Sequence, residues 1–367
     1  MKTARIWICF VFPGLVFFFS GLTANAEGNR YLEIIHLDVG QGDATLVISP
    51  SGKTLLIDGG DTGKGNRVVV PLLKARGIER LDYIVATHYD ADHIGGLDEV
   101  INHFQGQHGP ILDRGRAGRK QTPTSKAYAQ YVAAGGLSAD RNPVALGARA
   151  IDLDGGVSVR VVAAGGCVLG HGAKPVITKP DENSVSVAMV ISYGQFDYFI
   201  GGDLTGGGKS GNRKTPDVET SVARVVGDID VLKLSHHGSE TSSNEMFLAA
   251  TAPEIAVVSV GNKGKNKRYH HPRRSVLTRL HDLRTAGVLK KLYSTNRGET
   301  DGGLEDRDSK MLKIANGHIS LRTDGRRFAL NEDWYQVDGR NSRAVSTSDT
   351  GQVICGKTTG EILHGTS

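Results

Sequence analysis

The chain has 367 residues, of which 39% are hydrophobic and 23% charged, and its formal net charge is +5. This length is enough for one large domain or two ordinary ones, and the mild positive charge is compatible with a phosphate-bearing partner without requiring one. The three cysteines contain no CxxC pair. A thiolate zinc site of that spacing is therefore excluded, and any metal must be held by histidine and carboxylate.

The first 26 residues resemble a secretory signal peptide. Lys2 and Arg5 form a basic start, residues 6–22 are almost wholly apolar, and Ala24-Asn25-Ala26 is a small-x-small cleavage site. The alternative is an uncleaved membrane anchor, although the apolar run is near the lower limit for a bilayer span and contains a proline and a glycine. We predict cleavage after Ala26, a secreted or periplasmic location, and no stable membrane insertion afterwards. Removal of the two basic residues lowers the net charge to +3.

The first part of the chain predicts strands followed by two helices. Residues 31–57 show a strand, a turn and two strands joined by a hairpin, and residues 67–76 have helical spacing. A buried strand is expected to end at His88. After a glycine pair, apolar residues recur at helical spacing over 97–104, so a helix follows directly.

Residues 105–179 have a weaker pattern, rich in Gly, Ser, Pro and basic residues. We predict a short helix over 125–135 and a strand pair within 157–164, in an insertion that lies over the face of the site. A strand, a turn and a strand then end at Asp203, and residues 205–214 are interpreted as a flexible loop. Of the mature cysteines, Cys167 and Cys355 could form one disulfide in an oxidising compartment or could equally stay unpaired.

Further strands end near residues 237 and 261, a helix is expected around 276–283, and a hairpin closes the domain by residue 330. Residues 331–367 are polar and predict a loosely ordered tail. The organisation is thus a signal peptide over 1–26, one domain over 27–330 and a tail over 331–367. Several strands end in polar loops and alternate with helices, which indicates a layered α/β fold, in which sites collect where strands end.

Four potential metal ligands, His88, Asp90, Asp92 and His93, lie within six residues. If the first two end an extended strand, their period of two places both on one side, and the other two follow as the chain turns into a helix. A set of oxygen and nitrogen ligands suits one or two divalent ions such as zinc, manganese or iron, and the extra carboxylate favours the harder ions. A polar helix cap would explain any one of these residues, but not all four together.

Asp203 follows two glycines at a strand end, where it is placed to bridge two ions; a turn aspartate is the simpler alternative. His236 and His237 end another strand. Because adjacent strand residues point to opposite faces, we expect only one to enter the site, with His236 as the metal ligand and His237 as a supporting or substrate-contacting residue. Asp58, at the end of an earlier strand, is expected to orient the His88 loop from behind.

Residues 262–274 are strongly basic around His270, His271 and Pro272. They are either a solvated loop or a phosphate clamp beside the metal, with His271 near the scissile group. In the second interpretation the residues that hold the substrate include Lys265, Lys267 and Arg273.

The segments HLDVGQGDATLV, LLIDGG, THYDADHIGGL, ENSVSVAMVI, FIGGDL, VLKLSHHGS and RYHHP stand in the order found in the metallo-β-lactamase superfamily. They most resemble the extracytoplasmic hydrolase domain of ComEC-type DNA-uptake proteins, from about residue 31 to 330 with 105–179 poorly matched. The resemblance implies an α/β fold of the αββα sandwich type with a metal site at the strand ends. By matching positions it implies six metal ligands: His88, Asp90, Asp92, His93, Asp203 and His236.

Two departures qualify this resemblance. The usual second histidine of the first ligand group is Asp90 here, as in the ComEC-like branch. The usual histidine between that group and Asp203 has no clear equivalent, because this region offers Asn183 and Ser184. A second metal position is therefore expected to be weak or empty. The chain also lacks the multi-helix channel of DNA-uptake proteins, so we do not expect it to transport DNA.

From these features we predict a secreted, metal-dependent hydrolase, with zinc or manganese as cofactor and phosphodiesters, nucleic acid or nucleotide, as substrate, in effect a nuclease. The metal would lower the pKa of water and yield a hydroxide that attacks phosphorus. Asp92 would orient that water or take its proton, with His271 as the second catalytic residue. Hydrolysis of a lactone, thioester or β-lactam remains an alternative, as does a non-catalytic binding protein on the same scaffold.

Overall fold

The computed structural model describes residues 31–115, 125–138, 141–148, 150–262, 269–337 and 353–356. The signal segment predicted over 1–26 lies outside these ranges. Within them, no helix is both long and apolar enough to cross a lipid bilayer.

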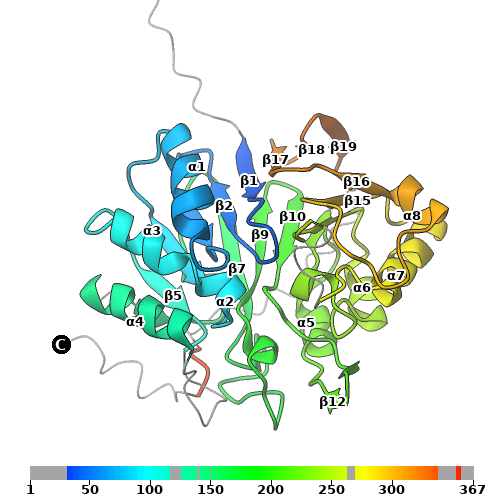
Figure 1. The fold of residues 1–367 in the computed structure, drawn as a ribbon, viewed down its shortest axis with the longest axis horizontal. Coiled ribbons are helices and arrows are strands. Elements are labelled where there is room, and N and C mark those ends of the chain that lie inside the picture. Colours follow the sequence, from blue (N-terminus) through cyan, green and yellow to red (C-terminus); the bar gives the residue numbers. More distant parts are fainter. Residues whose placement is uncertain are drawn as a thin grey trace, which may run out of the picture.

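Two sheets pack face to face, with helices on both outer faces (Figure 1). The first sheet has the strand order β19-β18-β17-β1-β2-β3-β4-β5-β6. Its strands are β1 (Leu32–His36), β2 (Thr45–Ile48), β3 (Thr54–Ile57), β4 (Tyr83–Ala86), β5 (Ile111–Asp113), β6 (Arg141–Pro143), β17 (Ile319–Thr323), β18 (Arg327–Leu330) and β19 (Asp333–Gln336).

The second sheet has the order β16-β15-β14-β13-β10-β9-β7-β8. Its strands are β7 (Val157–Ala164), β8 (Cys167–Val168), β9 (Ala188–Tyr193), β10 (Phe196–Ile200), β13 (Val231–Lys233), β14 (Ile255–Val258), β15 (Lys291–Ser294) and β16 (Leu312–Ile314). Strands β3, β4, β5 and β6 are mutually parallel, as are β10, β13, β14, β15 and β16. The carboxyl ends of parallel strands lie at one edge of a sheet, so loops from both sheets can meet there.

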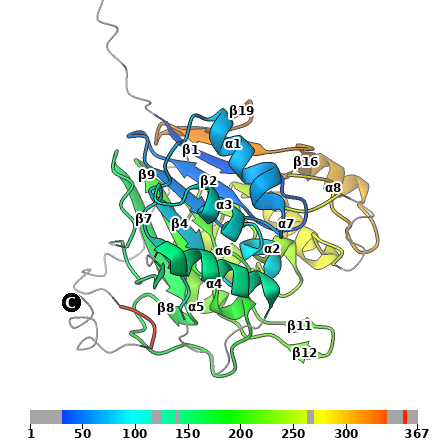
Figure 2. The ribbon, with the colours of Figure 1, turned by 60° about the vertical axis from the view of Figure 1, so that its left-hand side comes forward.

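Helices cover the outer face of each sheet (Figures 1 and 2). The first sheet carries α1, α3 and α4, while α5, α6 and α7 cover the second. The helices are α1 (Val70–Ala75, preceded by a π-helical turn, Gly65–Val69), α2 (Ala91–Ile94), α3 (Leu97–His103), α4 (Lys126–Ser138), α5 (Glu219–Val226), α6 (Glu245–Thr251), α7 (Arg274–Thr285) and α8 (Asp306–Met311), with 3₁₀ turns η2 (Asn183–Val185) and η3 (Ser235–Gly238).

The sandwich has four layers: helices, the first sheet, the second sheet and helices. Three apolar clusters lie between these layers. The middle cluster lies between the sheets and includes Val85 and Met189, while the outer clusters include Leu56 under α1 and Leu232 under α5. Because both faces of each sheet are covered, strands such as TLLI and IAVV are wholly buried and, apart from Thr54, apolar at every position. The αββα sandwich expected from the sequence is confirmed.

The stretch 105–179 corrects one part of that expectation. It supplies β5 and β6 to the first sheet and β7 and β8 to the second, so its described residues build the sandwich instead of forming an insertion across the site. The predicted helix is α4, whereas the strand pair predicted within 157–164 is the single strand β7, which pairs with β8 just after it. Short strands interrupted by glycine-rich turns weaken the sequence pattern, although tertiary pairing still forms the strands.

Two further segments are more ordered than their composition suggested. Residues 209–214, interpreted as a flexible loop, form the hairpin of β11 (Lys209–Ser210) and β12 (Arg213–Lys214), which projects from the sandwich (Figure 2). Strand β19 extends the first sheet beyond residue 330, into the predicted tail. Cys355 forms a disulfide with Cys167 at a Cα–Cα distance of 5.6 Å, which answers the open question of their pairing.

Candidate metal centre

The first group of candidate ligands lies on the loop from β4 into α2. His88 and His93 are fully buried, whereas the side chain of Asp90 is 48% exposed. Asp90 is the extended residue just before α2, with φ −74° and ψ 147°. Strand β4 ends at Ala86, two residues before the end predicted at His88, and the chain enters the helix with Asp92 and His93, as the sequence pattern predicted.

Asp203 reaches the centre because the preceding glycines allow close packing. Gly202 has φ +51°, and a Cβ atom built on it would lie 2.6 Å from Thr87 Oγ1. A side chain at this position would be strained by its φ and would also clash with the β4 loop. Gly202 thus brings the second sheet against the first where Asp203 begins its turn.

His236 and His237 both face Asp203, which corrects the expectation that only one would enter the site. Strand β13 ends at Lys233, and both histidines have left-handed backbones, with φ +50° and +52°. The alternation of a strand no longer applies to them. The pair therefore turns both rings toward the same carboxylate.

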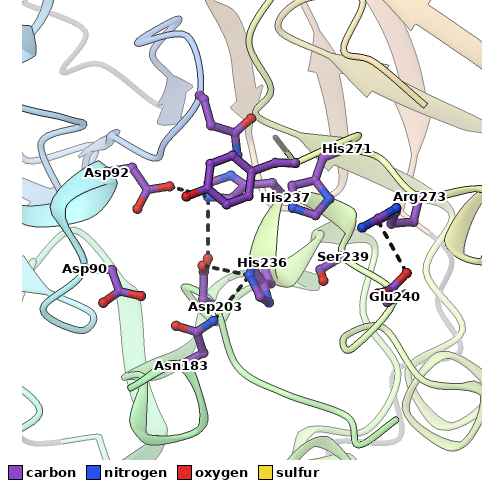
Figure 3. Close-up of a pocket in the computed structure, with 12 residues that line it drawn as sticks. Asp90, Asp92, Asn183, Asp203, His236, His237, Ser239, Glu240, His271 and Arg273 are labelled. Atoms are coloured by element: carbon purple, nitrogen blue, oxygen red, sulfur yellow. Dashed lines mark hydrogen bonds and ion pairs between the residues drawn. The ribbon is translucent and has the colours of Figure 1, made fainter. Parts of the chain in front are cut away.

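The carboxylate of Asp203 is the centre of the arrangement (Figure 3). Its Oδ1 lies 3.1 Å from His93 Nε2 and 3.7 Å from His237 Nε2. Its Oδ2 lies 3.6 Å from His236 Nε2 and 3.9 Å from His88 Nε2. Each oxygen is thus shared with its own pair of imidazoles.

Each pair of imidazoles is accompanied by one further carboxylate. Asp92 Oδ2 lies 3.4 Å from His237 Nε2, and Asp90 Oδ2 lies 3.7 Å from His88 Nε2. The other five predicted ligands are therefore gathered around Asp203, and His237 joins them. We call the set on the Oδ1 side (Asp92, His93, His237) the inner set, and the set on the Oδ2 side (His88, Asp90, His236) the outer set.

Four of the atoms that face one another are buried and make no hydrogen bond within the described residues: His88 Nε2, His93 Nε2, His237 Nε2 and Asp203 Oδ1. Leaving such groups unsatisfied costs about 1–3 kcal/mol each. A divalent cation is bound by nitrogen and carboxylate oxygen atoms whose lone pairs point toward one position. The residues present therefore fit a metal ion.

In three of the histidines, the hydrogen bond made by Nδ1 determines which ring nitrogen is free to bind a metal ion. Asp58 Oδ2 accepts the Nδ1–H of His93 at 2.8 Å and the hydroxyl of Thr87 at 2.7 Å. Since the Thr87 proton is given to Asp58, its oxygen accepts the Nδ1–H of His88, at 3.1 Å. The Nδ1 of His237 lies 3.1 Å from the carbonyl of Ser259, which only accepts. In all three rings Nε2 is left with a lone pair toward Asp203.

Asp43, which is not among the predicted ligands, also lies close to the inner set. Asp43, His93, Asp203 and His237 offer ligand atoms within 4.8 Å of one another. However, the Asp43 oxygens lie 2.7 and 2.9 Å from the buried ammonium of Lys233, which neutralises them. Asp92 is therefore the better ligand, and Asp43 ties the two sheets together. A lysine within the apolar strand VLKL was the signal for this buried pair.

The charges of the centre depend on one another. Burial alone would raise the pKa of Asp203, but when no metal is bound His93, His236 and His237, in their protonated forms, hold it well below its usual range. Burial, together with His236 and His237, lowers the pKa of His271 to about 2. At neutral pH Asp203 is thus an anion, while His271 is a neutral imidazole able to exchange hydrogen bonds.

A cavity of about 390 Å³ opens over the centre (Figure 3). Asn183 lies in its wall, with Nδ2 3.3 Å from His236 Nε2, in the region where the superfamily usually has a histidine. His271 is also in the wall, with its ring centroid 5.8 Å from that of His236.

Of the basic residues predicted to hold the substrate, Arg273 faces Glu240, 3.4 Å away. Lys265 and Lys267 lie outside the described residues. The wall is completed by Gln41, Ser239, Glu240 and Tyr269, none of which is among the predicted site residues.

The comparisons with known proteins agree with this architecture. The family model described as the metallo-beta-lactamase superfamily matches residues 37–262. The chain is 28% identical over 320 residues to ComE operon protein 3 of Bacillus subtilis (strain 168), a match that covers 79% of this chain and 36% of that protein. It is 30% identical over 247 residues to competence protein ComA of Neisseria gonorrhoeae, covering 66% of this chain and 28% of that protein.

The chain thus spans about a third or less of the length of these curated relatives. Among solved structures, a diphosphatase of the PhnP family has a TM-score of 0.40 at 14% identity, covering 80% of this chain and 98% of that chain. The family match extends over more than half of the chain, and both its motifs and its sandwich are those of the family. The chain therefore belongs to the metallo-β-lactamase superfamily and, within it, is similar to the ComEC-like competence proteins.

Proposed function

We propose that this protein is a secreted or periplasmic metal-dependent hydrolase that cleaves phosphodiesters in a nucleic acid or nucleotide. The observation that carries the proposal is the Asp203 carboxylate, each of whose oxygens is shared with a pair of imidazoles at the floor of an open cavity. This arrangement suits one or two divalent ions. Asp90 and Asp92 in the two sets, together with the central Asp203, favour manganese or zinc over softer ions.

When bound, a divalent ion supplies a Lewis acid that acidifies water and polarises a phosphoryl oxygen. The chain's own groups supply the rest. Asp92 has a side chain 33% exposed at the cavity, where its carboxylate can orient a water or accept its proton. His271 offers a neutral hydrogen-bonding group in the wall, and Arg273 a cation that can balance charge on a phosphate.

The cellular location is proposed from two features. The predicted signal peptide directs the chain out of the cytoplasm. The disulfide between Cys167 and Cys355 supports the same location, because such bonds persist in oxidising compartments.

The test is a screen of the purified protein against single-stranded DNA, duplex DNA, RNA and a chromogenic phosphodiester, with manganese, zinc and other divalent ions. Metal content is measured in parallel. We expect stoichiometric metal, phosphodiester cleavage, and a loss of at least a hundredfold in kcat for Asp92→Ala. Equal activity of Asp92→Ala, absence of bound metal, or cleavage of only lactones, thioesters or β-lactams would each contradict the proposal.

A further inference from the structure

The hairpin of β11 and β12 carries a concentration of positive charge that the metal centre does not use. Lys209, Arg213 and Lys214 fall within six residues. Lys209 and Lys214 are directly opposite each other in the antiparallel pair, and both are exposed. Like charges at directly opposed positions destabilise a strand pair. In the described parts of the chain no acidic side chain forms an ion pair with either lysine.

The hairpin is joined directly to the metal centre. It begins six residues after Asp203 in the sequence. At its base, Gly206 N donates to the carbonyl of Thr241 at 2.7 Å, and the hydroxyl of Thr241 lies 3.2 Å from His236 Nδ1. A path of two hydrogen bonds therefore links the hairpin to a histidine of the outer set.

The hairpin also adjoins the cavity over the centre. A Cβ atom built on Gly208 would lie 3.6 Å from the carbonyl oxygen of Glu240, and Glu240 lines that cavity. Glu240 and Lys209 together line a second, open hollow of about 560 Å³. The two hollows thus share a wall residue, and Lys209 lies at the rim of the second.

The remaining charged residues of the second hollow are Arg279, Glu245 and Asp282. Its floor is therefore not a cationic surface, and Glu240 is already paired with Arg273. Among the described residues, the hairpin lysines add positive charge on this side of the cavity to that of Arg273 and Arg279. The metal cavity itself, at about 390 Å³, has room for about one nucleotide and not for a duplex.

We propose that the β11–β12 hairpin guides the substrate strand: Lys209 and Lys214 contact phosphates of a single-stranded polynucleotide beyond the phosphodiester that lies in the metal cavity. This inference rests on the proposed function and adds the form of its substrate. The partner is a phosphate backbone, recognised by charge and without base sequence. A chain of several nucleotides should bind more tightly than a single phosphodiester, and the advantage should fall as salt screens it.

The test compares the wild-type protein with Lys209→Gln/Lys214→Gln. A matched control, Lys74→Gln/Lys126→Gln, removes the same charge from exposed positions on α1 and α4, on the opposite layer of the sandwich. A third variant, Lys209→Arg/Lys214→Arg, keeps the charge. Binding of a fluorescent 20-mer is followed by anisotropy across a salt series in EDTA, and hydrolysis of the 20-mer and of a chromogenic phosphodiester is followed with metal.

For the hairpin Gln variant we expect roughly 10- to 30-fold weaker 20-mer binding at 0.1 M salt and a salt slope smaller by about 1.4, the value for two contacts to a single strand. Its kcat/KM on the chromogenic phosphodiester should equal that of wild type. The Arg variant and the control should bind as wild type does. Unchanged 20-mer binding in the Gln variant would overturn the strand guide while leaving the proposed function standing.

Two other outcomes distinguish a failure of the proposed function from a failure of the strand guide. If no phosphodiester is cleaved with any metal, the proposed function fails, and the hairpin's role is judged from anisotropy alone. If the Gln variant loses binding to anionic phospholipid vesicles but not to the 20-mer, the partner is a membrane surface and the strand guide is overturned.

Discussion

Asp58 touches neither the cavity nor Asp203, yet it controls the chemistry of two ligands. Its carboxylate accepts the backbone N–H of Thr87 at 2.8 Å, the Thr87 hydroxyl and the Nδ1–H of His93. These hydrogen bonds determine which nitrogen of His93, and through Thr87 which nitrogen of His88, is free to bind a cation. Supporting carboxylates of this kind orient ligands and raise their basicity. Because Asp58 follows a strand, the sequence predicted that it would orient the His88 loop from behind.

Replacing Asp58 should therefore weaken metal binding without removing a ligand. For Asp58→Asn we expect metal affinity to fall by about 10- to 100-fold, because the amide no longer fixes the His93 tautomer. The measurement is a competition titration of zinc and manganese against a chromogenic chelator. Asp61→Asn, at an exposed position on the same loop, is the control and should bind metal as wild type does. Equal affinities for the two variants would show that Asp58 has no such role.

At the scale of elements, the site is built by loops that follow strands and that have left-handed backbone conformations. Gly202 follows β10 with a left-handed backbone packed on Thr87, and η3 turns His236 and His237 out of strand alternation. These loops are held by packing between the two sheets. A local rule such as strand alternation therefore cannot predict which side chains face the metal.

Gly202→Ala tests this close approach. We expect it to lower stability by about 2 kcal/mol or more and to reduce metal stoichiometry, because the new methyl group pushes Asp203 away from the β4 loop. Gly211→Ala is the matched control: its φ is +57°, but a Cβ there would meet nothing within 4 Å. It should show only the cost of the left-handed backbone. Urea denaturation and metal analysis measure both effects, and equal losses in the two variants would rule out the clash.

The loop that leads from η3 into α6 predicts a pH dependence. Glu219 in α5 is fully buried and accepts the backbone N–H groups of Ser243 and Asn244, each at 2.8 Å. Burial raises the pKa of Glu219 from 4.5 to about 7. A carboxyl whose pKa is raised on folding contributes stability that is complete below pH 4.5 and is lost as the pH rises to 7.

Glu219→Gln should remove this component, of about 3 kcal/mol, and make the free energy of unfolding flatter between pH 4.5 and 7. Urea denaturation in EDTA at several pH values measures it, because metal removal excludes the pH dependence of metal binding. Glu245→Gln, an exposed neighbour, is the control. If the free energy of unfolding of Glu219→Gln changes with pH as steeply as that of wild type, the pH dependence belongs to other groups.

At the scale of the molecule, long-range contacts join parts that are far apart in the sequence. The buried ion pair of Asp43 with Lys233 spans 190 residues and links the first sheet's loops to β13. The disulfide between Cys167 and Cys355 spans 188 residues and ties residues 353–356 to the end of the second sheet. Neither pairing of distant residues can be read from a local pattern, and the ion pair joins the halves of the sandwich that share the metal centre.

The disulfide should contribute substantially to stability, because it closes a long loop in the unfolded chain. For Cys167→Ser/Cys355→Ser we expect the free energy of unfolding to fall by about 2–5 kcal/mol. Denaturation with and without reductant measures this. The wild-type protein should become less stable on reduction, while the double variant should be insensitive to it. A wild-type midpoint unaffected by reductant, with thiol titration confirming reduction, would contradict the expectation.

The sequence by itself determined the features that depend on short spacings. His88, Asp90, Asp92 and His93 lie within six residues, so a strand end and one helical turn suffice to bring them together. Uninterrupted apolar runs likewise indicated strands buried on both faces, and the order of motifs indicated the fold family. The ligand spacing and the apolar runs follow from backbone periodicity and burial, which are local properties of the chain, whereas the fold family rests on the resemblance of the ordered motifs.

Only the tertiary structure decided which distant groups meet. The approach of both His236 and His237 to Asp203 depends on left-handed residues that alternation does not describe, and the neutralisation of Asp43 by Lys233 depends on the packing of two sheets. The strands within 105–179 also form through pairing with partners elsewhere in the chain. Such contacts are fixed by the summed burial and hydrogen bonding of the whole sandwich, for which no short stretch of sequence carries the information.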